Sequence, residues 1–194
     1  SDKQMVKMMP ECDVFIGLSA VSVESFTYAK KQFGALTVCE RGSAHVLSQA
    51  SELEGNRKAR LSKNYIEREL ASYREADYVS IPSIYSEKTF IDNNYEAERL
   101  FINNYGVNLE RFKPLPCEHV GSGKVKRVLF VGGWTYQKGC DFINEILKID
   151  TSISITHAGM KGDLEFPKSS RFVSLGHVEN NELPEVMNCH DVLI

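Results

Sequence analysis

A glycine-rich turn at residues 132–139 has the residue types of an anion-binding site. The continuously apolar run VLFV leads into Gly132 and Gly133, and Lys138 stands where a helical pattern begins. Because glycine has no Cβ, a phosphate can approach the backbone N–H groups of such a turn. A helix start adds partial positive charge there, and Lys138 adds a full charge. These residues predict a diphosphate site.

The turn by itself does not identify the ligand. The Walker pattern G-x-x-x-x-G-K-[ST] does not fit, because Lys138 precedes a glycine and no Ser or Thr follows. The dinucleotide pattern G-x-G-x-x-G is also absent. Turn geometry alone explains such glycines equally well, with Lys138 a solvated charge and Trp134 a packing residue. Local chemistry therefore predicts phosphate affinity and leaves the ligand class open.

Polar residues also follow apolar runs nearer the amino terminus. Arg41, Ser43 and His45 come after the run 35–40, and we interpret them as part of an acceptor-side cleft. Gly17, near the end of an earlier run, is assigned to the same cleft. The structural alternative is that Ser43 caps a helix beginning near His45.

Composition argues against several classes of protein. A net charge of -3 gives no basic footprint for nucleic acid. No apolar run reaches the roughly 20 residues that span a bilayer, and the start lacks the apolar core of a signal peptide. We therefore predict a cytoplasmic protein, with peripheral membrane contact left open. Five separated cysteines without a CxxC pair, and the absence of a D-x-D pair, predict no disulfide framework and no metal site. We also expect no cofactor.

Short apolar runs alternate with helical patterns along the chain. The runs are continuously apolar, which is typical of parallel strands covered on both faces, and they lie at 13–19, 35–40, 77–82, 99–105, 126–132, 152–159, 171–176 and 191–194. Helices are predicted at 22–33, 56–76, 83–92, 137–148 and 182–189. The alternation predicts an α/β fold with right-handed crossovers.

Residues 110–125 interrupt this alternation with two prolines and a Gly-Ser-Gly triplet, and we interpret them as an interdomain linker. Residues 1–109 then belong to one Rossmann-like domain and 126–194 to a second. About four strands on each side are few for a doubly wound domain, so we expect an internal fragment of a longer protein. Exposed edges of such half-sheets predict self-association.

Three longer stretches occur in the order known from one enzyme family. LFVGGWTYQKGCDFINEIL is similar to a strand leading to G-R-x-x-x-x-K-G, and INNYGVNLERFKP is similar to I-x-N-G-V-D-x-x-x-F-x-P. VSLGHVENNELPEVMNCHDVLI follows in the place of a sugar-nucleotide subdomain. From Asp13 onward the chain resembles the GT-B glycosyltransferases of family 4 (group 1).

The resemblance implies a retaining, metal-independent transferase of the hexosyltransferase type. Such an enzyme moves a sugar from a nucleotide-sugar donor to a hydroxyl of a sugar, glycan or lipid-linked acceptor in polysaccharide or glycoconjugate synthesis. It implies that Lys138 is the catalytic cation for the leaving diphosphate. The donor-binding residues it implies are Gly132, Gly133, Lys138, Gly159, His177, Val178 and Leu183.

The chain departs from the family pattern in two places. The family's arginine after the first glycine corresponds to Gly133, so one cation is missing. The E-x7-E carboxylates would lie beyond Ile194, and the early N-terminal domain is expected to be absent, so the fragment alone is expected to be inactive. Two alternatives stay open: a non-catalytic nucleotide-binding fragment, and a GT-B-shaped sugar-nucleotide epimerase.

Overall fold

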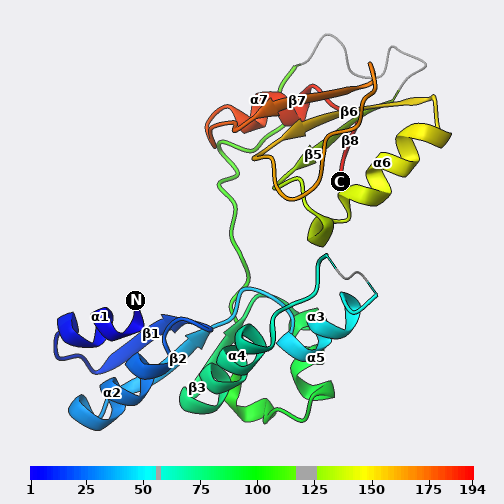
Figure 1. Cartoon of the computed structure of the whole chain (residues 1–194). Helices are drawn as coiled ribbons and strands as arrows, with labels where there is room; N and C mark the ends of the chain where they lie inside the picture. Colours follow the sequence, from blue (N-terminus) through cyan, green and yellow to red (C-terminus); the bar gives the residue numbers. More distant parts are fainter. Residues whose placement is uncertain (56–57, 117–125) are drawn as a thin grey trace. The chain divides into compact units, whose positions relative to one another are not determined.

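The computed structural model describes residues 1–55, 58–116 and 126–194. They form two compact units, Ser1–Gly106 and Val107–Ile194 (Figure 1). Each unit contains one four-stranded sheet in which neighbouring strands run parallel, with helices in the crossovers. The predicted α/β class is confirmed. The predicted linker 110–125 begins inside the second unit, and its residues 117–125 lie outside the described part of the chain.

The sheet of the first unit has the order β1-β2-β3-β4. Its strands are β1 (Val14–Leu18), β2 (Leu36–Glu40), β3 (Tyr78–Ile81) and β4 (Leu100–Ile102), the last preceded by a 3₁₀ turn at Ala97–Arg99. Its helices are α1 (Asp2–Met8), α2 (Val23–Phe33), α3 (Val46–Glu52), α4 (Lys63–Glu75) and α5 (Ile84–Asp92). The core gathers around Phe26, Tyr73 and Phe90, all of which are buried.

Local chemistry sets where the helices of this unit begin and end. Ser62 starts α4, because its hydroxyl oxygen accepts a hydrogen bond from Tyr65 N at 3.2 Å. The helix therefore begins seven residues later than the predicted residue 56. Gly34 ends α2 in the left-handed conformation, with φ +66°, and its N–H bonds back to the last turn.

The sheet of the second unit has the order β7-β6-β5-β8. Its strands are β5 (Lys126–Val131), β6 (Ile153–Ala158), β7 (Phe172–Gly176) and β8 (Val192–Leu193). Its helices are a 3₁₀ turn at Tyr136–Lys138, α6 (Cys140–Ile149) and α7 (Leu183–Asn188). The last strand in sequence thus pairs with the first strand of the unit.

Trp134 is the centre of the second core. Its side chain is fully buried, and its ring centroid lies 5.0 Å from that of Phe172 and 5.5 Å from that of Phe130. The indole N–H donates to Glu165 O at 3.3 Å. These contacts confirm the packing role considered for Trp134 and leave its ring no free face for a ligand.

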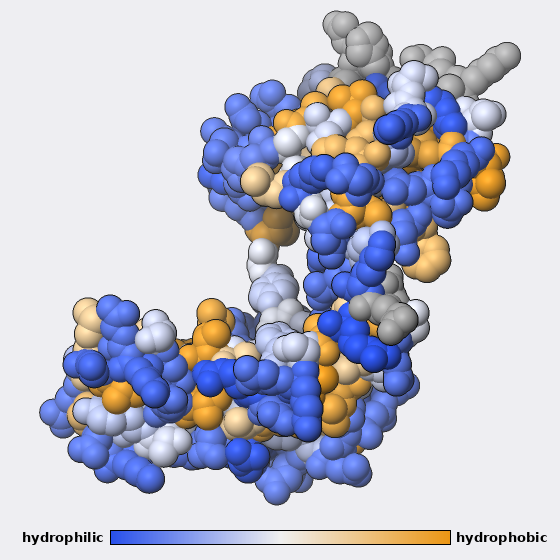
Figure 2. All heavy atoms as spheres, viewed as in Figure 1, coloured by the Kyte–Doolittle hydropathy of each residue, from blue (hydrophilic) through white to orange (hydrophobic). Residues whose placement is uncertain are grey.

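Apolar side chains are exposed on both units, as the orange spheres of Figure 2 show. Strand β1 lies at an edge of its sheet and exposes Val14, Ile16 and Leu18. Edges of this kind favour pairing with another chain, so self-association stays a prediction. None of the described helices is long and apolar enough to cross a bilayer.

Candidate functional site

The glycine turn extends the carboxyl end of β5 alongside the end of β6. Gly132 N donates to Ala158 O and Trp134 N donates to Met160 O, both at 3.0 Å. Gly133 lies between these anchored residues, and its N–H has no hydrogen-bond partner within residues 1–55, 58–116 and 126–194. An open backbone donor therefore lies where α/β proteins bind their ligands, beyond the carboxyl ends of the strands.

The turn reaches α6 in two steps. Thr135 starts a short 3₁₀ turn, and its hydroxyl oxygen accepts from Lys138 N at 3.3 Å. Gly139 then takes the left-handed conformation, with φ +71°, and α6 begins at Cys140 instead of the predicted residue 137. The Lys138 side chain is exposed, and its ammonium has no ion pair among the described residues. It is therefore available as a mobile positive charge beside the turn.

Gly159 completes the same edge of the sheet. Its φ is +154°, and a Cβ at this position would lie 2.0 Å from the carbonyl oxygen of Gly132. Its N–H donates to Gly176 O at 2.7 Å. The structure thus brings Gly132, Gly133 and Gly159 together at the ends of two neighbouring strands. Because Gly159 has no side chain, the Gly132 carbonyl can occupy the space beside it.

His157 lies directly beneath this turn and is fully buried. Its Nε2 is 2.8 Å from Gly132 O and its Nδ1 is 3.0 Å from Ser174 Oγ. Sequence reasoning overlooked this residue. The available signal was a histidine inside an otherwise apolar run, two residues before a glycine at a strand end.

The remaining predicted donor residues follow β7. His177 is exposed, with Nε2 3.2 Å from Glu179 Oε1, while Val178 and Leu183 are half-buried. Leu183 is the first residue of α7, and Pro184 follows it in the first turn, as suits a helix start. These residues lie in the connection from β7 to α7, and their contact with a nucleotide base stays a prediction.

Arg41, predicted for the acceptor cleft, is an interior residue of the first unit. It is 5% exposed, and its Nη1 donates to Glu69 Oε1 at 2.7 Å. Its other donors bond to Gln49 Oε1 and the carbonyl oxygen of Ala44. The guanidinium is therefore already bound by internal partners, and an acceptor contact would have to compete with them.

His45 is also buried, and it corrects the capping alternative. Its Nδ1 accepts from Leu47 N at 3.3 Å, so His45 caps α3 where Ser43 was considered for that role. Ser43 is half-buried. Gly17 is buried, and a Cβ at this position would lie only 2.7 Å from Ser22. An acceptor contact of these residues stays a prediction.

The stability of the first unit should fall as the pH drops from 6.5 towards 4. Burial lowers the pKa of His45 to about 4, with a further contribution from Arg41 that Glu69 opposes. The unfolded chain, with a histidine pKa near 6.5, then binds a proton that the folded unit does not, so acid favours unfolding. The loss should reach up to about 3 kcal/mol between pH 7 and pH 4.

Urea unfolding at a series of pH values measures this loss. The matched control is His45→Asn, because asparagine caps helices well and does not titrate. The variant should remove the His45 part of the pH dependence. An identical pH dependence in both proteins would contradict the assignment.

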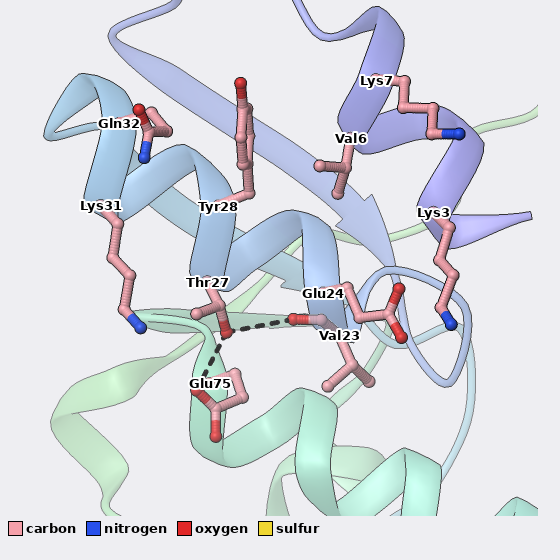
Figure 3. A pocket seen from close by; sticks show the side chains of 10 residues that line it. All are labelled: Lys3, Val6, Lys7, Val23, Glu24, Thr27, Tyr28, Lys31, Gln32 and Glu75. Atoms are coloured by element: carbon pink, nitrogen blue, oxygen red, sulfur yellow. Dashed lines mark hydrogen bonds between the residues drawn. The ribbon is translucent and has the colours of Figure 1, made fainter.

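A separate groove of about 640 Å³ lies between α1 and α2 (Figure 3). Val6, Val23 and Tyr28 supply apolar surface, and Lys3, Lys7 and Lys31 carry charge around it. None of the donor-binding or acceptor-side residues that were predicted from the sequence lines this groove. It is therefore not part of the candidate donor site.

Comparison with solved structures identifies the architecture. HepE from Anabaena, in a crystal structure with UDP and glucose, matches with a TM-score of 0.72 and 15% identity over 99% of this chain and 54% of HepE. Sucrose-phosphate synthase from Thermosynechococcus elongatus matches with a TM-score of 0.72 and 16% identity, over 93% of this chain and 49% of that protein. The chain therefore has the GT-B fold. The catalytic domain of starch synthase IV from Arabidopsis thaliana, bound to ADP and acarbose, matches at 0.58 with 10% identity, over 99% of this chain and 53% of that chain.

Comparison of the sequence with those of known proteins finds one relative of this chain. An uncharacterized 41.2 kDa protein in the cps region of Klebsiella pneumoniae is 29% identical over 141 residues, which are 67% of this chain and 38% of that protein. No protein-family profile matches the chain. The chain spans about half the length, or less, of these proteins. Membership of family 4 stays a prediction.

Proposed function

We propose that this chain is the part of a glycosyltransferase that binds the diphosphate of a nucleotide-sugar donor. The observation that carries the proposal is the open N–H of Gly133 at the carboxyl end of β5, next to a turn that bears the exposed Lys138. The GT-B fold supports it, because HepE has been crystallised with UDP and with UDP-glucose. UDP is therefore the first nucleotide to test.

In this proposal the second unit stabilises charge on the leaving group. When the bond between the anomeric carbon and the diphosphate oxygen breaks, that oxygen gains negative charge. The Lys138 ammonium, the Gly133 N–H and the start of α6 are positive groups that could face it. One such contact typically contributes about 3 kcal/mol to the transition state. Lys138 would be the catalytic residue, and the acceptor hydroxyl would attack the anomeric carbon.

The finer features of the proposal come from the sequence resemblance. They are retention of configuration, metal independence, a hexose as the transferred group, and an acceptor in polysaccharide or glycoconjugate synthesis. His177, Val178 and Leu183 are proposed to contact the nucleotide, with Arg41, Ser43, His45 and Gly17 on the acceptor side. The internal partners of Arg41 and His45 make these two the weakest members of the set.

An epimerase acting on the nucleotide sugar is the second candidate. A UDP-N-acetylglucosamine 2-epimerase from Listeria monocytogenes shares the fold at a TM-score of 0.50 and 9% identity, over 99% of this chain and 54% of that chain. The match is weaker than those to HepE and sucrose-phosphate synthase. Incubation with labelled nucleotide sugars separates the two: a transferase releases the nucleotide as it forms a glycoside, and an epimerase returns a changed sugar still bound to it.

Substitution of Lys138 by alanine should raise the dissociation constant for UDP about tenfold. A charge-assisted hydrogen bond contributes about 1.5–3 kcal/mol, and 1.4 kcal/mol corresponds to a factor of ten. Isothermal titration calorimetry with UDP, GDP and ADP measures the effect. Lys126→Ala is the control, because this exposed lysine begins β5 at the opposite end of the strand. Equal UDP affinity in Lys138→Ala and wild type would remove Lys138 from the site.

A further inference from the structure

We propose that His157 is a positioning residue for the donor site. Through the proton on Nε2 it holds the carbonyl group of Gly132 and thereby directs the Gly133 N–H towards the diphosphate. The ligand in this statement rests on the function proposed above. The role of His157 in fixing the turn rests on its own contacts.

The partners of the ring determine which nitrogen carries the proton. Gly132 O is an acceptor only, so the 2.8 Å contact requires a proton on His157 Nε2. In the neutral ring Nδ1 is then an acceptor, and the Ser174 hydroxyl, 3.0 Å away, donates to it. Ser174 Oγ in turn accepts from Gly176 N at 3.4 Å. The ring therefore connects the turn after β5 to the end of β7.

Peptide geometry turns this contact into a direction for the Gly133 donor. No cis peptide bond occurs in the described residues, so the bond between Gly132 and Gly133 is trans. In a trans peptide the C=O and N–H groups point in opposite directions. Because the Gly132 carbonyl points at the buried His157 ring, the Gly133 N–H points away from it. The hydrogen bond that fixes the carbonyl also fixes the donor.

Burial prevents the His157 ring from moving away. The side chain is fully buried, and its ring centroid lies 5.2 Å from that of Trp134, 5.4 Å from that of Phe166 and 5.8 Å from that of Phe130. Gly159 lies on the same side, where a Cβ would be 3.1 Å from His157 Nε2 and closer still to Gly132 O. The glycine leaves room for both partners, and an aliphatic residue in place of His157 would leave the carbonyl without this donor.

Two substitutions separate positioning from packing. His157→Phe keeps an aromatic ring in the core but cannot donate to Gly132 O. His157→Gln replaces the ring with an amide that can donate. We expect His157→Phe to raise the dissociation constant for UDP about tenfold, as the loss of one well-directed donor predicts, and His157→Gln to recover most of the affinity.

Nuclear magnetic resonance of the whole chain reports on the turn without any nucleotide. Nitrogen-15 shifts of wild-type His157 should show a protonated Nε2 and a bare Nδ1. The amide resonance of Gly133 should be a single sharp signal in the wild type, should broaden or shift in His157→Phe, and should return towards the wild-type position in His157→Gln.

The results test the positioning role of His157 and the proposed function separately. UDP binding by wild type, with equal binding and an unchanged Gly133 signal in folded His157→Phe, would overturn the positioning role and leave the proposed function intact. If wild type binds no nucleotide, the proposed function fails for this chain, and the Gly133 signal still decides whether His157 fixes the turn. If His157→Phe does not fold, a wild-type ring protonated on Nδ1 with a bare Nε2 would overturn the inference.

Discussion

Gly159→Ala should destabilise the second unit by roughly 3–6 kcal/mol, enough to unfold much of it, since small domains are stable by only about 5–15 kcal/mol. The new Cβ would lie 2.0 Å from Gly132 O and 2.7 Å from Gly132 C, which are backbone atoms and not the movable end of a side chain. The φ of +154° adds strain for any residue with a side chain. Urea unfolding followed by Trp134 fluorescence reports on this unit, because Trp134 is the only tryptophan in the sequence.

Gly176→Ala is the matched control, since it lies in the same unit at the end of the neighbouring strand. Its φ is +70°, and a Cβ there would meet nothing within 4 Å. It should cost about 1–2 kcal/mol, the strain of a left-handed residue alone. A Gly159→Ala protein as stable as Gly176→Ala would mean that β5 and β6 separate at their ends without difficulty.

Arg41→Met should destabilise the first unit by about 3–5 kcal/mol, because it leaves the Glu69 carboxylate buried without its cationic partner. The ion pair measures 2.7 Å, and its side chains are only 6% and 1% exposed. Methionine retains much of the length of the arginine stem, so the main change is the loss of charge and hydrogen bonds. Urea unfolding followed by circular dichroism measures the effect.

Two further variants test whether burial is the cause. Lys63→Met removes a partner from the exposed pair with Glu67 in the same unit, where the side chains are 92% and 63% exposed, and it should change stability by less than about 1 kcal/mol. The double variant Arg41→Met, Glu69→Met should lose less stability than the sum of the losses in the two single variants, because neither charge is then left buried without its partner. Additive losses would show that the two side chains act independently.

The sequence predicted the strands better than the helices. The eight strands of the described residues all lie within the predicted apolar runs. Strands of parallel sheets are rich in apolar residues, and this holds here even for β1, whose alternate side chains are exposed. The short helix α1 was missed, since about two turns give too little periodicity to recognise. A helix near His45 was considered only as the alternative to a cleft, and α3 begins there, at Val46. The starts of α4 and α6 were misplaced because single residues, Ser62 and Gly139, fix them.

The candidate site also contains residues that the sequence pattern indicates and residues that it does not. Gly132, Gly133 and Lys138 could be proposed from the sequence because they follow one another closely where an apolar run meets a helical pattern, and their contact with a phosphate stays a prediction. His157 could not, because its role depends on β6 pairing with β5, and one histidine in an apolar run does not reveal its neighbours. The burial of Arg41 also depends on tertiary structure, since its partner Glu69 comes from α4.

The position of β8 beside β5 has a consequence for the order of folding during synthesis. Asp191 N donates to Arg127 O at 2.8 Å and Ile194 N donates to Leu129 O at 2.9 Å, so β8 can pair with β5 only after residues 191–194 are made. Pairings between such distant residues slow folding. Until then one side of β5 remains an open edge on the nascent chain, and this is where premature association with other unfinished chains would begin.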